Sequence, residues 1–297
     1  MSENLYTHAD QNILRTWIFM SFFFVLVIAL GFLISDIYQS PAILYFAVFF
    51  AIFMNIFSYW YSDKIVLKLH KARPATRVDN FELWTVTENL AITAGLPMPK
   101  LYIIDDQAPN AFATGRNKDH AVICVTSGLL GMMDKNELQG VIAHEMSHIG
   151  NKDMLLSTVV VVLAGFISLL SNFFLRSMWF GGGRRNNNQG DAGGILMLVG
   201  IVFAILSPIV ALLIQLAISR KREFLADASG ALLTRYPEGL ASALKKIGAY
   251  GMPMKTANSA DAHLFISNPF GSKAGFSVQK LFMTHPPVAE RIKALVG

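Results

Sequence analysis

The feature that most constrains the fold of this chain is a set of four long stretches without a charged residue. They lie between Arg15 and Asp36, Asp36 and Asp63, Asp153 and Arg176, and Asp191 and Arg220, and they contain 20, 26, 22 and 28 residues. A bilayer core requires roughly 20 consecutive apolar residues. Globular helices seldom run this far without a charge, and the first stretch is longer than the apolar region of a signal peptide and is not followed by a cleavage site. The sequence therefore predicts an integral membrane protein with four transmembrane helices.

Lysine and arginine residues beside these spans predict how the chain is oriented. The short loop after the first span has none, whereas basic residues follow the second span (Lys64 to Arg77) and the fourth (Arg220 to Arg222). We expect these polar segments in the cytoplasm. The third and fourth spans are joined by a loop with three nearby arginines, which conflicts with full crossing; residues 154–219 either cross completely, which we favour, or form a shallow hairpin.

Three regions follow from this pattern: two N-terminal transmembrane helices (1–62), a membrane hairpin (154–219), and one cytoplasmic domain assembled from residues 63–153 and 220–297. Within that domain, residues 81–94 predict a helix ended by Gly95, and residues 100–105 and 120–126 predict two short strands. The net charge of +5 comes from cations that flank apolar segments, so the lipid bilayer is an expected partner and nucleic acid is not.

The clearest chemical motif is His144-Glu145-Met-Ser-His148, inside a predicted helix that starts with a capping box at Asp134 and ends near Gly150. Histidines at i and i+4 project from one helix face and can bind one zinc ion, while the glutamate lies beside a metal-bound water. A single cysteine in the chain excludes a cysteine-based site. The sequence thus predicts a mainly α integral membrane protein with a cytoplasmic α+β, zincin-like metalloprotease domain that carries a small β-sheet.

A catalytic zinc site normally has three protein ligands. Directly after the fourth span, Glu223 and Asp227 share a helix face at i and i+4. The membrane hairpin brings this helix back to the one that ended at residue 153, so we assign Glu223 as the third ligand of one zinc ion per chain. Asp227 is expected to accept the other N–H of a ligand histidine. An ordinary surface pair is the alternative.

The order of two N-terminal spans, HEMSH, a membrane hairpin, SRKREFLAD and a closing THPPVAERI resembles the HtpX family of bacterial membrane heat-shock proteases over nearly the whole chain. The resemblance implies a multi-pass zinc endopeptidase of the cytoplasmic membrane, with its site on the cytoplasmic side, that removes misfolded membrane proteins under stress. It matches Glu145 to the family's catalytic acid/base, and His144, His148 and Glu223 to its zinc ligands. It also implies that His285 lies near the site, where we expect it to donate to the oxyanion.

Other residues receive weaker predictions. Arg291 is expected to pair with a carboxylate such as Asp227 instead of clamping substrate, and His263 or His120 could replace His285. His8 and His70 are expected to be solvated. Exposed strand edges bind extended chains, so a substrate edge is predicted over Asn110, Ala111, Phe112 and Ala113, with an ordinary loop as the alternative.

Three other functions compete with proteolysis of misfolded membrane proteins. An inactive membrane scaffold is disfavoured because all the residues needed for zinc binding and proton transfer are present. Intramembrane proteolysis is disfavoured because charged residues frame the motif helix. Prenyl-peptide processing is the remaining alternative, since the type I CAAX endopeptidases share the zinc motifs and a segment similar to Asn110-Ala-Phe-Ala113, although they have more spans than this chain can hold.

Overall fold

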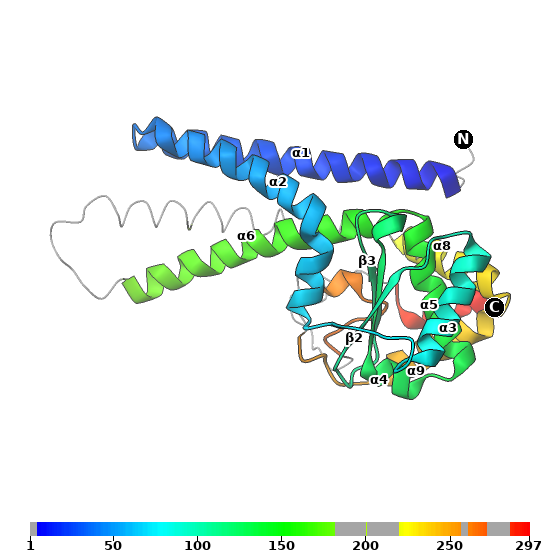
Figure 1. Ribbon diagram of the computed structural model, residues 1–297. Coiled ribbons are helices and arrows are strands. Elements are labelled where there is room, and N and C mark those ends of the chain that lie inside the picture. The colour runs from blue at the N-terminus through cyan, green and yellow to red at the C-terminus, as the bar shows by residue number, and fades with distance from the viewer. Residues whose placement is uncertain (1–4, 182–199, 201–219, 257–260, 272–285) are drawn as a thin grey trace.

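The computed structural model describes residues 5–181, 200, 220–256, 261–271 and 286–297. The structure of this part of the chain is mainly helical (Figure 1). Its helices are α1 (Leu5–Ile37), α2 (Pro41–Leu69), α3 (Phe81–Ala94), α4 (Ser127–Met132), α5 (Lys135–Gly150), α6 (Asp153–Gly181), α8 (Arg220–Thr234), α9 (Pro237–Ala249) and α10 (Val288–Val296), with the short 3-10 helices η1 (Lys118–His120) and η2 (Ala262–Leu264). Its strands are β1 (Arg73–Pro74), β2 (Lys100–Ile104), β3 (Ala111–Thr114) and β4 (Val122–Thr126).

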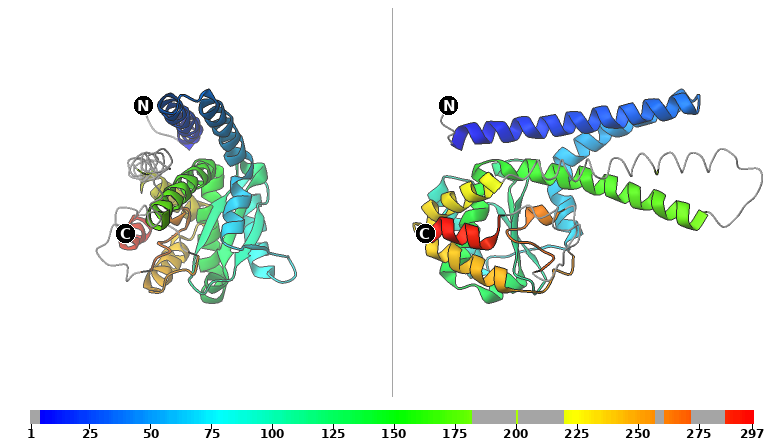
Figure 2. Two further views of the ribbon diagram at one scale, coloured as in Figure 1. Left: turned by 90° about the vertical axis from the view of Figure 1, so that its left-hand side faces the viewer. Right: turned by 180° about the vertical axis from the view of Figure 1, so that it is seen from behind.

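Helices α1, α2 and α6 extend to one side of the molecule, away from the sheet (Figures 1 and 2). Within the described residues, Gln11–Asp36 and Pro41–Leu69 are long and apolar enough to cross a membrane. A third crossing is added only if α5 and the first part of α6, which meet at 84°, count as one bent span. Helices α1 and α2 keep large apolar side chains such as Phe32 and Tyr45 exposed, as is typical of surfaces that face lipid.

The first two predicted spans thus correspond to helices of sufficient length, although α2 continues beyond the expected end at residue 62 as far as Leu69. The third predicted span begins with α6 at Asp153, as expected. The fourth lies outside the described residues except for Gly200. The domain boundaries and the crossing of residues 154–219 therefore stay predictions.

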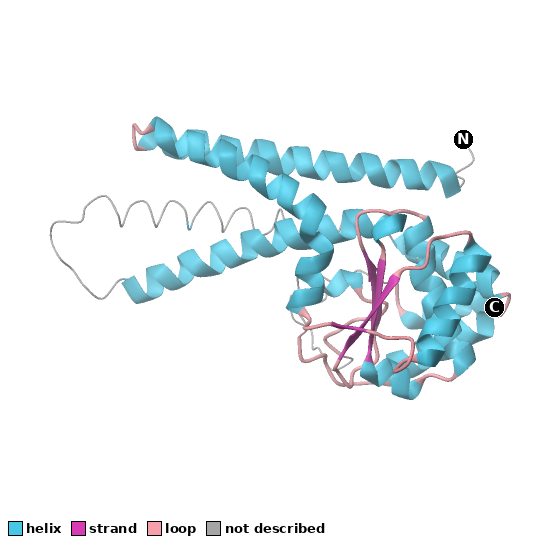
Figure 3. Cartoon of the chain, viewed as in Figure 1, coloured by secondary structure: helices cyan, strands magenta, loops and turns pink. Residues whose placement is uncertain are grey.

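The four strands form one mixed sheet in the order β1-β2-β4-β3 (Figure 3). Strands β2 and β4 are parallel, and β1 and β3 pair antiparallel with them at the two edges. Helix α3 and strands β2 and β4 confirm the predicted secondary structure, including the left-handed Gly95 that ends α3. The connection between the two predicted strands contains a further strand, β3, because Ala111 to Thr114 extends the sheet beside β4.

Each face of the sheet packs against a different apolar layer. Alternate residues such as Ala113 and Ile123 face a core built with α3, α5 and α9. The residues between them, such as Phe112 and Cys124, face a second core that includes the end of α2 and Phe265. Because side chains alternate along a strand, the edge strand β3 packs against α5 with one face and against the end of α2 with the other. This arrangement places β3 directly beside the HEMSH helix.

Candidate metal centre

Helix α5 carries the motif residues, and its start is set by local hydrogen bonds. Asp134 Oδ1 accepts from the backbone N–H groups of Asn136 and Glu137, and Glu137 Oε2 accepts from the N–H of Asp134 at 2.9 Å. This is the predicted capping box. Helix α5 ends at Gly150, as predicted; a glycine there suits a left-handed cap, but the residue with positive φ between α5 and α6 is Lys152 (57°). This residue lies at the bend where α5 and α6 meet at 84°.

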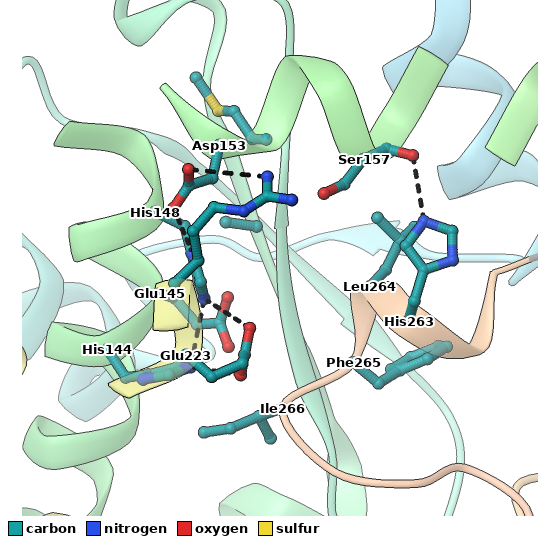
Figure 4. Close-up of a pocket in the computed structure, with 13 residues that line it drawn as sticks. His144, Glu145, His148, Asp153, Ser157, Glu223, His263, Leu264, Phe265 and Ile266 are labelled. Atoms are coloured by element: carbon teal, nitrogen blue, oxygen red, sulfur yellow. Dashed lines mark hydrogen bonds and ion pairs between the residues drawn. The ribbon is translucent and has the colours of Figure 1, made fainter. Parts of the chain in front are cut away.

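The two motif histidines and Glu223 of α8 converge on one point (Figure 4). His144 Nε2 and His148 Nε2 are 3.2 Å apart, and the carboxylate oxygens of Glu223 lie 3.8 Å from His144 Nε2 and 3.7 Å from His148 Nε2. Three ligands placed around 2.0–2.2 Å from a tetrahedral zinc are separated by about 3.3–3.6 Å. Two imidazoles and one carboxylate are also a donor set that catalytic zinc uses. The residues present therefore fit a zinc ion.

Asp227, one turn after Glu223, contacts the other ring nitrogen of a motif histidine. His144 Nδ1 lies 2.9 Å from Asp227 Oδ1. Arg291 of α10 donates two hydrogen bonds to the same carboxylate, from Nε to Oδ2 at 2.8 Å and from Nη2 to Oδ1 at 2.6 Å. Burial opposes ionisation of Asp227, but the Arg291 and His144 hydrogen bonds outweigh it and lower its pKa to about 2. The carboxylate therefore stays charged and holds His144 with Nε2 toward Glu223.

Arg291 also joins this carboxylate to the chain segment after η2. Its Nη1 donates to the carbonyl oxygen of Ile266 at 2.8 Å, and its side chain is 1% exposed. The predicted pairing of Arg291 with Asp227 is the contact that the structure contains. Buried guanidinium groups with such bidentate partners are rigid. Arg291 thus fixes α8, α10 and the segment at Ile266 relative to one another.

Asp153 contacts the outer ring nitrogen of His148 as Asp227 contacts that of His144, and this role was not predicted from the sequence. Its Oδ2 lies 3.1 Å from His148 Nδ1, and its Oδ1 accepts a hydrogen bond from Asn12 of α1. The signal was available, because Asp153 follows His148 by five residues, but it was interpreted only as the edge of a membrane span. A carboxylate at the start of α6 therefore orients His148, and α1 contacts that carboxylate directly.

Glu145 lies beside the three converging side chains and is 1% exposed. Burial, together with the negative charge of Glu223, raises the pKa of Glu145 to about 7, against the opposing effects of His148, Arg291 and a hydrogen bond from the Ala113 backbone N–H. A carboxylate with a pKa near neutrality can both accept and return a proton near pH 7. The same hydrogen bond connects Glu145 to the edge strand β3.

The predicted substrate edge is buried to a greater extent than expected. Asn110 hydrogen-bonds through its side chain to the carbonyl oxygen of Ser267 at 3.1 Å, and Phe112 is fully buried. The carbonyl oxygen of Ala111 already accepts from the N–H of Ile266 at 2.9 Å. Of the four predicted edge residues, Ala113 is the one that lines the cavity beside the motif histidines.

The remaining histidines have different surroundings. His285 lies outside the described residues. His263 lines the cavity of the motif histidines and contacts the carbonyl oxygen of Ser157 at 3.3 Å (Figure 4), whereas His120 is exposed and contacts Asn117. His70 is not solvated as predicted: it is buried against Phe112 and Phe265, with Nε2 3.2 Å from Asp261 Oδ2. The side chain of His8 lies outside the described set.

Comparison with known proteins decides the family. The model of the family described as Peptidase family M48 matches residues 78–297. The chain belongs to peptidase family M48, among the HtpX proteases. It is 49% identical over 295 residues to a "Protease HtpX homolog" of Caldanaerobacter subterraneus subsp. tengcongensis, covering 98% of this chain and 97% of the relative. It is 47% identical over 283 residues to one of Pyrococcus furiosus, covering 95% and 94% of the two chains.

The fold of this HtpX chain is similar to that of a solved structure. The crystal structure of S. mikatae Ste24p aligns with a TM-score of 0.51 and 19% identity, over 98% of this chain and 67% of that one. At this identity the likeness concerns the fold alone. The family membership and the two apolar helices together make the chain a membrane metalloprotease, as the sequence motifs predicted.

Proposed function

We propose that this HtpX chain is a zinc endopeptidase of the bacterial cytoplasmic membrane that cleaves unfolded or misfolded membrane proteins in quality control and the stress response. The observation that carries the proposal is the convergence of His144, His148 and Glu223 beside a buried Glu145. The first three would hold one zinc ion per chain. When bound there, zinc would supply a Lewis acid and lower the pKa of its water to about 7.

Glu145 has the position and the pKa of the acid/base. It takes a proton from the attacking water and returns it to the leaving nitrogen of the peptide bond. Asp227, oriented by Arg291, and Asp153 hold the two imidazoles in the tautomers that direct Nε2 toward Glu223. His285 stays our proposed oxyanion donor, and among the described residues His263 is the histidine that could replace it. No acyl-enzyme forms in this scheme.

The substrate would lie extended along β3. Within that strand the proposal narrows to Ala113, which lines the cavity, whereas the carbonyl oxygen of Ala111 already accepts from Ile266. Because the N–H of Ala113 donates to Glu145, the carbonyl group of Ala113 is the one proposed to pair with the substrate. Backbone pairing favours unfolded and accessible chains over particular sequences. The basic residues beside the spans support a site on the cytoplasmic side. The N-terminal end of α1, which lies at the same end as the sheet, suits this orientation (Figure 1).

The first prediction concerns Glu145→Ala, measured in detergent by zinc content and by cleavage of casein. We expect comparable zinc in wild type and variant, and a loss of activity of about 10²-fold or more, because the proton acceptor is removed and the three ligands remain. His144→Ala should lose zinc, and Glu223→Gln should bind it more weakly. Glu82→Ala, at an exposed position of α3, is the control. Equal activity of Glu145→Ala and wild type would refute the mechanism and favour an inactive scaffold or a contaminating protease.

Prenyl-peptide processing stays the alternative function, and the fold shared with Ste24p is consistent with it without favouring it. To distinguish the two functions, a farnesylated C-terminal peptide and unlipidated casein are offered as substrates to the same preparation. Cleavage of the lipidated peptide alone would favour the alternative.

A further inference from the structure

Arg222, in the first turn of α8, is a buried cation beside the metal centre that the mechanism above does not use. Its side chain is 9% exposed, and it lines the same cavity of about 40 Å³ as His144, Glu145 and His148. The neighbouring cations Arg220 and Lys221 are exposed. The chain thus turns one of three consecutive basic side chains inward, toward the metal centre.

The hydrogen bonds of this guanidinium are incomplete. Its Nη1 lies 4.0 Å from Asp153 Oδ1, whereas Nε and Nη2 are buried and have no hydrogen-bond partner in the part of the chain that the structure describes. Nε–H and Nη2–H point in the same direction from the planar group and form a two-pronged donor edge. Buried charged donors are rarely left without an acceptor, so this edge points to an oxygen that a ligand supplies.

The charge of the cavity indicates what kind of oxygen this is. Glu145, Glu223 and Asp153 already bring carboxylates to its lining. A further anion would meet these charges, whereas the carbonyl oxygen of a peptide is neutral and has two lone pairs for two N–H donors. A peptide that crosses the metal centre necessarily brings main-chain carbonyl groups into this cavity.

We propose that Arg222 is a substrate-binding residue whose Nε and Nη2 donate to a main-chain carbonyl oxygen of the peptide next to the scissile bond. The proposal rests on the proposed function, because it takes the ligand to be a peptide. Asp153 then contacts three groups, since its Oδ2 faces His148, whereas its Oδ1 accepts from Asn12 and faces Arg222. The spacing between metal ligand and substrate donor is thereby fixed by a single carboxylate at the start of α6.

The test measures binding in zinc-loaded protein that carries Glu145→Ala, so that cleavage does not interfere. A fluorescent casein-derived decapeptide and a set of analogues, each with one amide replaced by a thioamide, are titrated in detergent and followed by anisotropy. The sulfur of a thioamide is a weaker acceptor than oxygen. Arg222→Met removes the donor edge, Arg222→Lys keeps the charge without it, and Arg220→Met is the exposed control on the same turn.

We expect Arg222→Met to weaken binding of the parent peptide about tenfold and Arg220→Met to leave it unchanged. One thioamide position should weaken binding to the Arg222 protein by about threefold or more, and this penalty should disappear in Arg222→Met and in Arg222→Lys. Zinc content, measured in each variant, should be retained. Identical thioamide penalties with and without the guanidinium would overturn the proposal and leave Arg222 as a structural partner of Asp153.

The outcome is separable from that of the proposed function. Position-specific coupling in the binding assay, combined with no casein cleavage by wild type, would refute the endopeptidase and retain the role of Arg222. Casein cleavage without coupling would refute only the role of Arg222. Failure of every peptide to bind the zinc-loaded protein would also overturn the role of Arg222.

Discussion

At the scale of single residues, each motif histidine has its own carboxylate. Asp227 contacts Nδ1 of His144 and Asp153 contacts Nδ1 of His148, so both imidazoles present Nε2 to the same point. A carboxylate on the outer nitrogen fixes the tautomer of a metal-ligating histidine and raises its basicity. The metal centre therefore depends on five side chains, three that would touch zinc and two that orient them.

The second prediction tests the two orienting carboxylates. Asp153→Asn and Asp227→Asn should each weaken zinc binding by about 10–100-fold, because the amide keeps the size of the side chain but removes its charge. Affinity is measured by competition with a chromophoric chelator. Asp119→Asn, at an exposed position of η1, should bind zinc as the wild type does. Wild-type affinity in Asp153→Asn would show that His148 is oriented by other groups.

The third prediction concerns pH. Burial disfavours a charged His148, but the Asp153 hydrogen bond and the negative charges of Glu223, Asp153 and Glu145 outweigh it and raise the pKa of His148 to about 9. Burial lowers the pKa of His144, which is therefore neutral near pH 7. Zinc binds neutral imidazole, so below pH 9 it must displace one proton, from His148.

Zinc affinity of the metal-free protein should accordingly rise by about tenfold per pH unit between pH 7 and 9 and then level off. Calorimetry in buffers of different ionisation enthalpy should record about one proton released near pH 8. In Asp153→Asn the affinity should level off at lower pH. An affinity that does not change between pH 7 and 9 would contradict the raised pKa of His148.

At the scale of elements, the position of α5 depends on glycines at its contacts with two other helices. A Cβ on Gly230 of α8 would lie 3.0 Å from the backbone nitrogen of His144, and a Cβ on Gly140 of α5 would lie 2.6 Å from the backbone nitrogen of Leu240 in α9. These close approaches let α8 bring Glu223 and Asp227 to the motif histidines. They are packing requirements that a periodicity analysis of one helix does not reveal.

The fourth prediction compares two glycine substitutions. Gly140→Ala should destabilise the protein by about 1–3 kcal/mol, because the new methyl group meets backbone atoms of α9 that can only move with the helix. This exceeds the gain of about 1 kcal/mol expected for alanine in a helix. Gly131→Ala in α4 meets no atom within 4 Å and should be neutral or stabilising. Thermal unfolding in detergent measures both, and equal midpoints for the two variants would contradict the packing argument.

At the scale of the whole molecule, the fifth prediction tests the side of the membrane on which the site lies. The native Cys124 is fully buried, and burial raises the pKa of its thiol, so it should not react with a maleimide. A cysteine introduced at Asp119→Cys is exposed on the sheet-containing part of the chain. A membrane-impermeant maleimide should label it in inside-out vesicles and not in right-side-out vesicles. Labelling only in right-side-out vesicles would reverse the proposed orientation.

The sequence alone predicted the features that depend on neighbouring residues. Local hydrophobicity, propensity and backbone geometry predict two N-terminal helices long enough to cross a membrane, the capping box of α5, the end of α3 at Gly95 and the two strands β2 and β4. The pairing of the motif histidines follows from one helix turn. The family could be recognised for the same reason, because its motifs are short and contiguous.

The tertiary structure decided what depends on residues far apart in the chain. It places Asp153 against His148, buries His70 against Asp261, closes the edge at Ala111 with Ile266 and turns Arg222 into the cavity. Each of these outcomes depends on how α1, α6, α8 and the segment at η2 pack around α5. The energies of such contacts are defined only in the folded chain, because the sequence does not show whether a polar side chain lies in water or beside a metal ligand.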